Sequence, residues 1–123
     1  MTPSQLTTLA EQTVVALQRK LPGPLRELAV AVPVHYEQFP SEDIIKEGFE
    51  PDILGLFTGA PHGAELDQEQ PMMPQILLYL GNLWDQAGGD RTFFCEEVRT
   101  TYLHELGHFL GWDEDDLAAR GLD

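Results

Sequence analysis

The segment HELGHFLGWDE, residues 104–114, contains the side chains best suited to chemistry in this sequence. His104 and His108 are four positions apart, and such residues share one face of a helix, so their imidazoles can bind one ion. Zinc suits this pair because imidazole is a good zinc ligand and tetrahedral coordination accepts two ligands from one helical turn. Glu105 follows His104 directly and would flank the same opening. The spacing therefore predicts a metal site on one helix.

A catalytic zinc site needs three protein ligands and one open position, which water occupies. Gly111 can adopt a positive φ at little cost, so it can end the helix and turn the chain back toward the histidines. Asp113 and Glu114 follow this glycine by two and three residues. Either carboxylate could supply the third ligand, and either could instead cap a closing helix.

Zinc beside a glutamate predicts hydrolysis of an amide bond. The ion lowers the pKa of bound water from its bulk value to about 7, and Glu105 is placed to accept the water proton as a general base. No acyl-enzyme is required in such a reaction. The competing interpretation treats His104 and His108 as ordinary core or surface histidines beside a helical glutamate.

Length and composition indicate one folded domain, spanning residues 1–123, with 42% hydrophobic and 23% charged residues. A net charge of -14 would repel phosphate backbones and anionic lipid surfaces, so we expect no nucleic-acid partner and no membrane partner. The sequence has no basic start followed by an apolar run and no apolar stretch near 18 residues, which favours a cytoplasmic location. It does not indicate the oligomeric state.

The C-terminal third carries the clearest periodicity. Apolar residues recur every three or four positions over residues 92–110, which predicts a long amphipathic helix that stops near Gly111. A short closing helix should follow, with Asp113 as its N-cap, Asp116 three residues later and Gly121 at its far end. We expect Cys95, the single cysteine, to be a buried thiol on the long helix without a reactive role.

The N-terminal region predicts a helix and a strand. Helical spacing of apolar residues favours a first helix over residues 4–21, with Ser4 as N-cap and the sequence Pro22-Gly23-Pro24 as its stop. The apolar, valine-rich residues 28–36 predict a strand, in which Pro33 favours an edge position or a bulge. His35 is then expected to be a surface or packing residue near the end of this strand rather than a ligand.

Short elements are expected in the middle of the chain. A helical turn is predicted over residues 41–46, capped by Ser41, and a short helix over residues 82–87. Two further strands are predicted, at residues 54–59 and 75–80. The stretch between these strands has no periodicity and contains three prolines, which is typical of a long surface loop. This loop carries His62 and Met72 and could close over the site, although an ordinary surface loop is the favoured interpretation.

The motif HExxHxxGxxE of residues 104–114 resembles the extended zincin pattern HExxHxxGxx(H/D) of metzincin-type metallopeptidases. More closely, the chain resembles the minimal zincin family, small bacterial and archaeal proteins thought to be zinc metallopeptidases. The likeness runs from the first helix through LGLFTGAP and QILLYLGNLWDQ to EEVRTTYLHELGHFLGWDEDDL. The last of these segments carries most of the specificity.

This resemblance implies an α+β fold, in which a small mixed sheet packs against an N-terminal helix and a long active-site helix. It implies one zinc ion per chain bound by His104, His108 and Glu114, with Glu105 as the catalytic base. The family usually has a shorter acid such as aspartate at the eleventh motif position. Asp113 is therefore kept as the alternative third ligand.

The sequence thus predicts a zinc-dependent metallopeptidase that acts on peptides or on a particular protein, with basic residues favoured near the cut because the site has an acidic rim. Residues 75–80 are the predicted sheet edge to which an extended substrate would add. The alternative function is a non-catalytic zinc-binding or interaction module on the same scaffold. A metal-dependent endoribonuclease ranks last, because its third ligand would be histidine and the net charge disfavours RNA.

Overall fold

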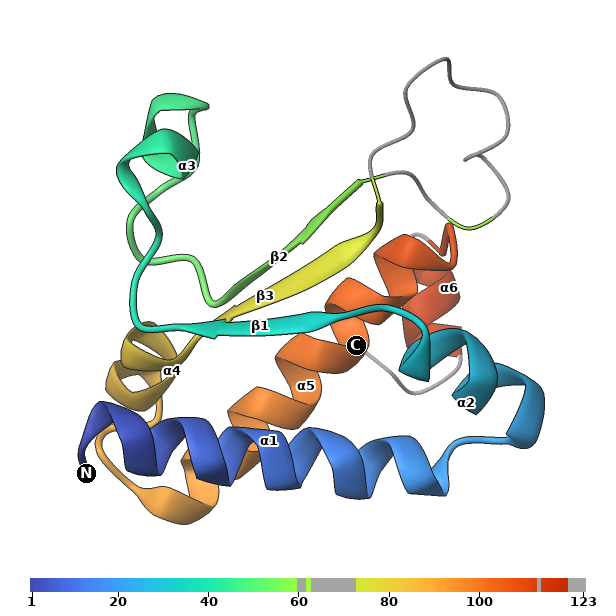
Figure 1. Cartoon of the computed structure of the whole chain (residues 1–123), viewed down its shortest axis with the longest axis horizontal. Helices are drawn as coiled ribbons and strands as arrows, with labels where there is room; N and C mark the ends of the chain where they lie inside the picture. Colours follow the sequence, from blue (N-terminus) through green and yellow to red (C-terminus); the bar gives the residue numbers. More distant parts are fainter. Residues whose placement is uncertain (60–61, 63–72, 113, 120–123) are drawn as a thin grey trace.

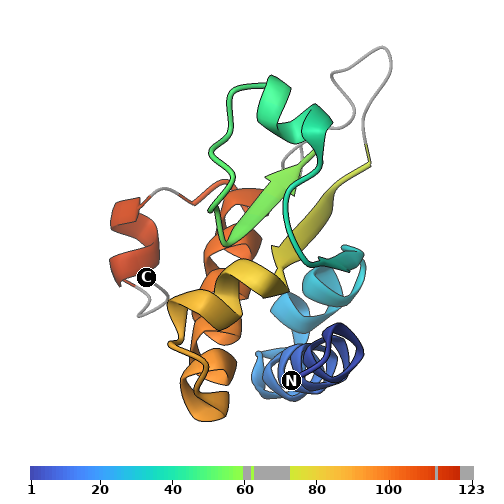
Figure 2. The ribbon, with the colours of Figure 1, turned by 90° about the vertical axis from the view of Figure 1, so that its left-hand side faces the viewer.

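The computed structural model describes residues 1–59, 62, 73–112 and 114–119, and it has the α+β organisation expected from the sequence. A small mixed sheet is covered on one face by helices, with α5 beneath β2 and β3, and with α1 beside α5 on the side of β1 (Figures 1 and 2). The elements in chain order are α1 (Pro3–Lys20), α2 (Gly23–Val30), β1 (Val34–Glu37), α3 (Glu42–Lys46), β2 (Gly55–Thr58), β3 (Gln75–Tyr79), α4 (Leu80–Gln86), α5 (Arg91–Phe109) and α6 (Glu114–Ala119).

The sheet has the strand order β1-β3-β2. β1 runs parallel to β3 with Val34 opposite Ile76, and β2 runs antiparallel to β3 with Gly55 opposite Leu78. Because β3 is hydrogen-bonded on both sides, the prediction that residues 75–80 offer a free edge to a substrate is wrong. The edge strand that packs against α5 is β2.

Helix α1 begins earlier than predicted. Its N-cap is Thr2 rather than Ser4, and Thr2 Oγ1 accepts a hydrogen bond from Gln5 N at 3.2 Å while Gln5 Oε1 accepts one from Thr2 N at 2.9 Å. This reciprocal pair is a capping box. Pro3 decides the position of the cap, because a proline without an N–H is favoured at the first helical position.

The predicted strand over residues 28–36 is only half right. Residues up to Val30 belong to α2, and the strand β1 contains only Val34–Glu37. α1 does end before Pro22, as predicted, but Pro24 then lies in the first turn of a second helix instead of breaking the chain. Pro33 immediately precedes β1. This strand lies at an edge of the sheet, as the proline predicted.

The remaining predicted elements are confirmed, with ends that shift by one or two residues. Ser41 caps α3 by accepting a hydrogen bond from Ile44 N at 3.4 Å. The strands β2 and β3 and the helices α4, α5 and α6 lie where expected. Most of the 60–74 segment lies outside the described residues. None of the helices in the described part of the chain is long and apolar enough to cross a membrane.

The core lies between the sheet and the two long helices. Tyr102 of α5 is fully buried there, and its hydroxyl oxygen accepts a hydrogen bond from Gln18 Nε2 of α1 at 3.0 Å. This contact and the apolar packing around it fix the rotation of α5 about its axis, which in turn sets the direction of its other side chains. The core side chains of α1, β3 and α5 are Leu6, Ala10, Val14, Leu17, Ile76, Leu78, Phe94, Val98, Tyr102, Leu106 and Phe109.

Candidate metal centre

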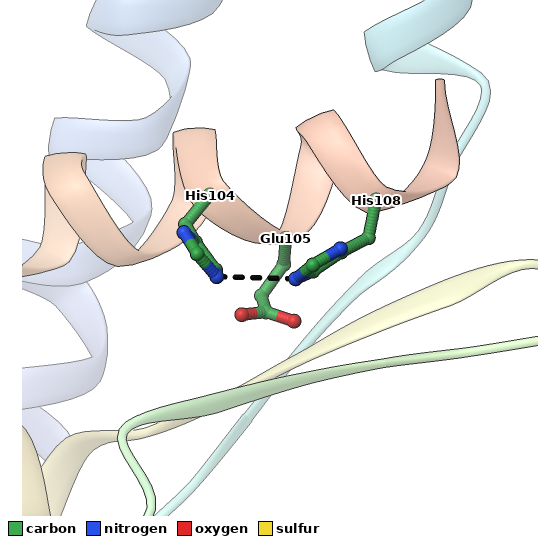
Figure 3. Close-up of side chains that lie close together, drawn as sticks. All are labelled: His104, Glu105 and His108. Carbon is green, nitrogen blue, oxygen red and sulfur yellow. Dashed lines mark hydrogen bonds between the residues drawn. The ribbon is translucent and has the colours of Figure 1, made fainter. Parts of the chain in front are cut away.

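The two motif histidines converge at the end of α5. The Nε2 atoms of His104 and His108 are 3.1 Å apart, and the two rings are almost perpendicular, at 86° (Figure 3). The four-residue spacing on one helix places both rings on the same side, as the sequence predicted. This convergence is the central feature of the site.

The nitrogen separation suits a bound zinc ion. Two imidazole ligands at zinc–nitrogen distances of about 2.0–2.1 Å in tetrahedral geometry would be about 3.3 Å apart. The observed 3.1 Å differs little from this value. The same distance also suits a hydrogen bond in which one neutral ring donates to the other. In both arrangements the two Nε2 atoms face one small space.

Glu105 completes the cluster. One carboxylate oxygen of Glu105 and one ring nitrogen of each histidine all lie within 4.8 Å of one another. The carboxylate projects toward the same side as the imidazoles (Figure 3), and the residue is only 9% exposed. A largely buried carboxylate beside two converging imidazoles is the arrangement expected of a base next to a metal ion.

The close approach of β2 to α5 holds Glu105 in place. A Cβ atom added to Gly55 would lie 2.6 Å from Thr101 Cγ2 and 3.4 Å from Glu105 Cγ, so only glycine fits there without displacement. Thr101 is itself 8% exposed and lies one helical turn before Glu105. Neither Gly55 nor Thr101 was predicted to be part of the site. A glycine inside a predicted strand was the available signal, because it often marks close backbone approach.

Gly111 ends the helix as predicted. It has φ +77°, its N–H donates to His108 O at 3.0 Å, and Trp112 N donates to Gly107 O at 2.9 Å. These two hydrogen bonds form a Schellman motif, which satisfies the terminal carbonyls and reverses the chain direction. The short helix α6 follows within three residues.

The predicted third ligand lies at the margin of the described structure. Glu114 is the first residue of α6, but the described part of that helix does not include its side chain. Asp113 and Gly121 lie outside the described residues, as does Met72. The structure therefore brings together His104, Glu105 and His108, while the third ligand stays a prediction.

The other two histidines occupy different places. His35 is exposed on β1 and is not part of the cluster, which agrees with its predicted surface role. His62 lies at the C-terminal end of α5, where its N–H donates to Phe109 O at 2.7 Å and its ring lies 5.7 Å from that of Phe109. Its imidazole is exposed and is not grouped with the metal-binding candidates.

Cys95 is only partly buried on α5, where it packs against the core. It lines a surface cavity together with Lys20 and Arg99. Basic side chains therefore lie near this thiol in space, although none was expected beside it from the sequence.

The family model described as a zincin-like metallopeptidase matches residues 29–122, a range that includes the histidine pair and Glu105. The chain belongs to this family. A comparison with curated proteins gave no match. Membership agrees with the α+β fold, the helix-borne histidine pair and the turn at Gly111, and together these features identify a zincin-like metallopeptidase scaffold with a group of side chains that could hold a metal ion.

Proposed function

We propose that this zincin-like protein is a zinc-dependent peptidase, with Glu105 as its general base. The observation that carries the proposal is the 3.1 Å approach of the His104 and His108 nitrogens beside the buried Glu105 carboxylate. A pure metal-binding module would need the histidines but not this carboxylate. The substrates would be peptides or a particular protein.

Bound zinc would act as a Lewis acid and lower the pKa of water in the site to about 7. Glu105 accepts a proton from the attacking water as the water oxygen bonds to the peptide carbonyl carbon. The same carboxyl group then delivers a proton to the amide nitrogen while the carbon–nitrogen bond breaks. The products are a carboxylic acid and an amine, and Glu105 returns to its starting state. The close approach of Gly55 restricts the rotation of the Glu105 side chain and keeps it aimed at the reacting atoms.

The substrate would bind to β2. Among the described strands β2 has a neighbour on one side only, and its other edge can pair with an extended peptide, which adds as a further strand through main-chain hydrogen bonds. Gly55, where β2 begins, lies against Glu105, so a peptide on this edge passes beside the histidine pair. This assignment replaces the one predicted for residues 75–80, since β3 has no free edge.

Replacing Glu105 by glutamine tests the mechanism. We expect Glu105→Gln to retain zinc and to lose roughly 10²–10⁴-fold in peptide hydrolysis, because glutamine cannot accept the proton. Glu96→Gln is the matched control, since Glu96 is exposed on the same helix and should not affect the rate. Equal hydrolysis by the Glu105 variant and the wild type would sink the proposed mechanism. If the wild type binds zinc but hydrolyses no peptide of a peptide library, the non-catalytic module is favoured.

For the third zinc ligand we propose Glu114, with Asp113 as the alternative. Removing a true ligand should weaken zinc affinity strongly, whereas removing a helix-capping acid should cost only about 0.5–2 kcal/mol of stability. Zinc titrations of Glu114→Ala and Asp113→Ala, read against unfolding measurements of the same variants, separate these roles. A cytoplasmic location stays a prediction from the sequence.

A further inference from the structure

A surface cavity adjoins the candidate metal centre on the side toward the start of α5. It has a volume of about 340 Å³, and it shares His104 and Glu105 with the metal-binding group. The other lining residues come from α5 and from the start of β2 with the segment before it; they are Glu97, Thr100, Thr101, Ile53, Leu54 and Gly55. The cavity therefore begins at the site of the proposed reaction and extends away from it along the helix.

The cavity combines apolar walls with a carboxylate. Ile53 and Leu54 supply aliphatic surface from one side. Glu97 precedes His104 by seven residues, which places it two turns away, about 10 Å along the helix axis. Glu97 is partly buried, and within the described part of the structure its carboxylate has no hydrogen-bond or ion-pair partner. The cavity thus has the candidate metal-binding residues His104 and Glu105 near one end and the unpaired Glu97 carboxylate near the other.

The charge of this cavity differs from that of three other surface cavities. Those three are lined partly by basic side chains, namely Arg91 in one, Lys20 and Arg99 in another, and Arg19 in the third. The cavity at the metal centre has two glutamates among its lining residues and no lysine or arginine. Both the local groups and the net charge of -14 favour a cationic occupant.

We propose that this cavity is a specificity pocket for an arginine or lysine side chain of the substrate, and that Glu97 binds its cationic end. This inference rests on the proposed peptidase function. The aliphatic stem of such a side chain would pack against Ile53 and Leu54 while its head reaches the carboxylate. Arginine suits the site best, because its guanidinium can form two parallel hydrogen bonds with a carboxylate.

The position of the pocket sets which substrate residue it accepts. An extended peptide advances about 3.3 Å per residue, and the pocket begins at His104 and Glu105. The basic residue is therefore the one next to the cleaved bond, or the following one. An uncharged side chain would pack against the apolar walls, but it would displace water from the Glu97 carboxylate. The hydrogen bonds between that water and the carboxylate would not be replaced, which is unfavourable.

A binding measurement tests the pocket without requiring turnover. N-acetyl-argininamide is titrated into the protein of residues 1–123, and the methyl NMR signals of Ile53 and Thr101 are followed, with N-acetyl-norleucinamide as the apolar probe. We expect saturable shifts with the arginine probe in the wild type and in Glu96→Gln. Glu97→Gln should weaken this binding about 10-fold or more, because a hydrogen-bonded charge pair is lost. Equal binding by Glu97→Gln, or the absence of shifts at both residues, would overturn the pocket.

A hydrolysis measurement separates this inference from the function on which it rests. Peptides that differ only in arginine, lysine, glutamine or glutamate beside the cut are compared for kcat/KM. The account predicts that arginine exceeds glutamine by about 10-fold or more, and that Glu97→Gln removes the preference but Glu96→Gln does not. Hydrolysis without a preference for basic residues would contradict the proposed pocket and would support the proposed peptidase function. Glu97-dependent binding of the probe without hydrolysis of any peptide would support the pocket and overturn the peptidase.

Discussion

Two faces of the same helix, α5, contribute in opposite ways. One face packs against α1 and the sheet and is almost completely excluded from solvent. The other face is turned toward the start of β2 and carries polar side chains that line the cavity or could hold a metal ion. The first face consists of Phe94, Val98, Tyr102 and Leu106, and the second of Glu97, Thr101, His104, Glu105 and His108.

The difference shows how a small domain can display a reactive group. Burial of the apolar face supplies the free energy that holds α5 in one orientation, since each large buried side chain contributes roughly 1.5–3 kcal/mol. The polar face therefore does not need to stabilise the fold, and it can bring two imidazole nitrogens and a carboxylate together. Truncating a side chain of the first face should therefore lower stability strongly, whereas replacing a histidine of the second face should mainly remove function.

The largest effect is expected from Phe94→Ala. Phe94 is fully buried, so its truncation leaves a cavity and should cost about 3–5 kcal/mol in the free energy of unfolding. Phe93→Ala is the matched control, because Phe93 is 57% exposed and should change stability by less than about 0.5 kcal/mol. Denaturant titration measures both values. Similar losses in the two variants would mean that this face of α5 is not packed as described.

On the polar face, the stabilising effect of zinc should depend on His108. At a free zinc concentration of 100 times its Kd, the metal should raise the unfolding free energy of the wild type by about 2.7 kcal/mol. His108→Ala should remove this increment while leaving metal-free stability almost unchanged. Unfolding curves recorded with zinc and with chelator measure both quantities. A large loss of metal-free stability in this variant would show that the two faces are not separable.

Gly55→Ala should disturb the polar face from the side of the sheet. The added methyl group would lie 2.6 Å from Thr101 Cγ2 and 3.2 Å from Leu77 O, and such crowding typically costs about 1–3 kcal/mol. Thr101→Ser removes the methyl group of Thr101. Combined with Gly55→Ala, it should restore part of the stability that Gly55→Ala alone loses. Gly23→Ala is the control, because nothing lies within 4 Å of the added atom there. Additive effects of Gly55→Ala and Thr101→Ser in a double-mutant cycle would argue against the close approach.

The last prediction concerns stability at alkaline pH and depends on Tyr36 of β1, which packs against the core. Burial, together with the charges of Glu11 and Tyr102, raises the pKa of Tyr36 from 10.0 to about 12. Because the folded-state pKa is the higher one, Tyr36 stabilises the fold fully below pH 10 and loses that contribution as the pH rises toward 12.

Tyr36→Phe should therefore lose less stability than the wild type between pH 10 and pH 12. Urea unfolding at several pH values in this window measures the difference. Some dependence should persist in the variant, because burial also raises the pKa of Tyr102. Parallel curves for the two proteins would show that Tyr36 does not titrate as described.

The sequence was most informative where a long pattern and a motif coincide. Nineteen residues of helical periodicity locate α5, and the four-residue spacing of His104 and His108 predicts their convergence without knowledge of the fold. The short apolar run of residues 28–36 was misjudged because a few apolar residues fit a helix as well as a strand. Local patterns also do not encode strand order, so the central position of β3 could not be predicted.

The parts of the site that could not be predicted from the sequence are those that depend on contacts between elements. Gly55 and Glu97 lie far apart in the sequence and gain their significance only because β2 packs against α5. A lone glutamate on a helix usually indicates a solvated face, and no spacing rule connects it to residues near position 54. Only the three-dimensional structure shows that Glu97 and the catalytic candidates line one cavity.

The most direct test of the account is the zinc content of the purified, untagged protein, with His108→Ala and His35→Ala measured alongside. The account predicts about one zinc per chain in the wild type and in His35→Ala, because a site of this kind holds one ion and His35 lies outside it. It predicts no bound zinc in His108→Ala. A wild-type protein that binds no zinc even after the metal is added back would contradict the assignment of the histidine pair as a metal site.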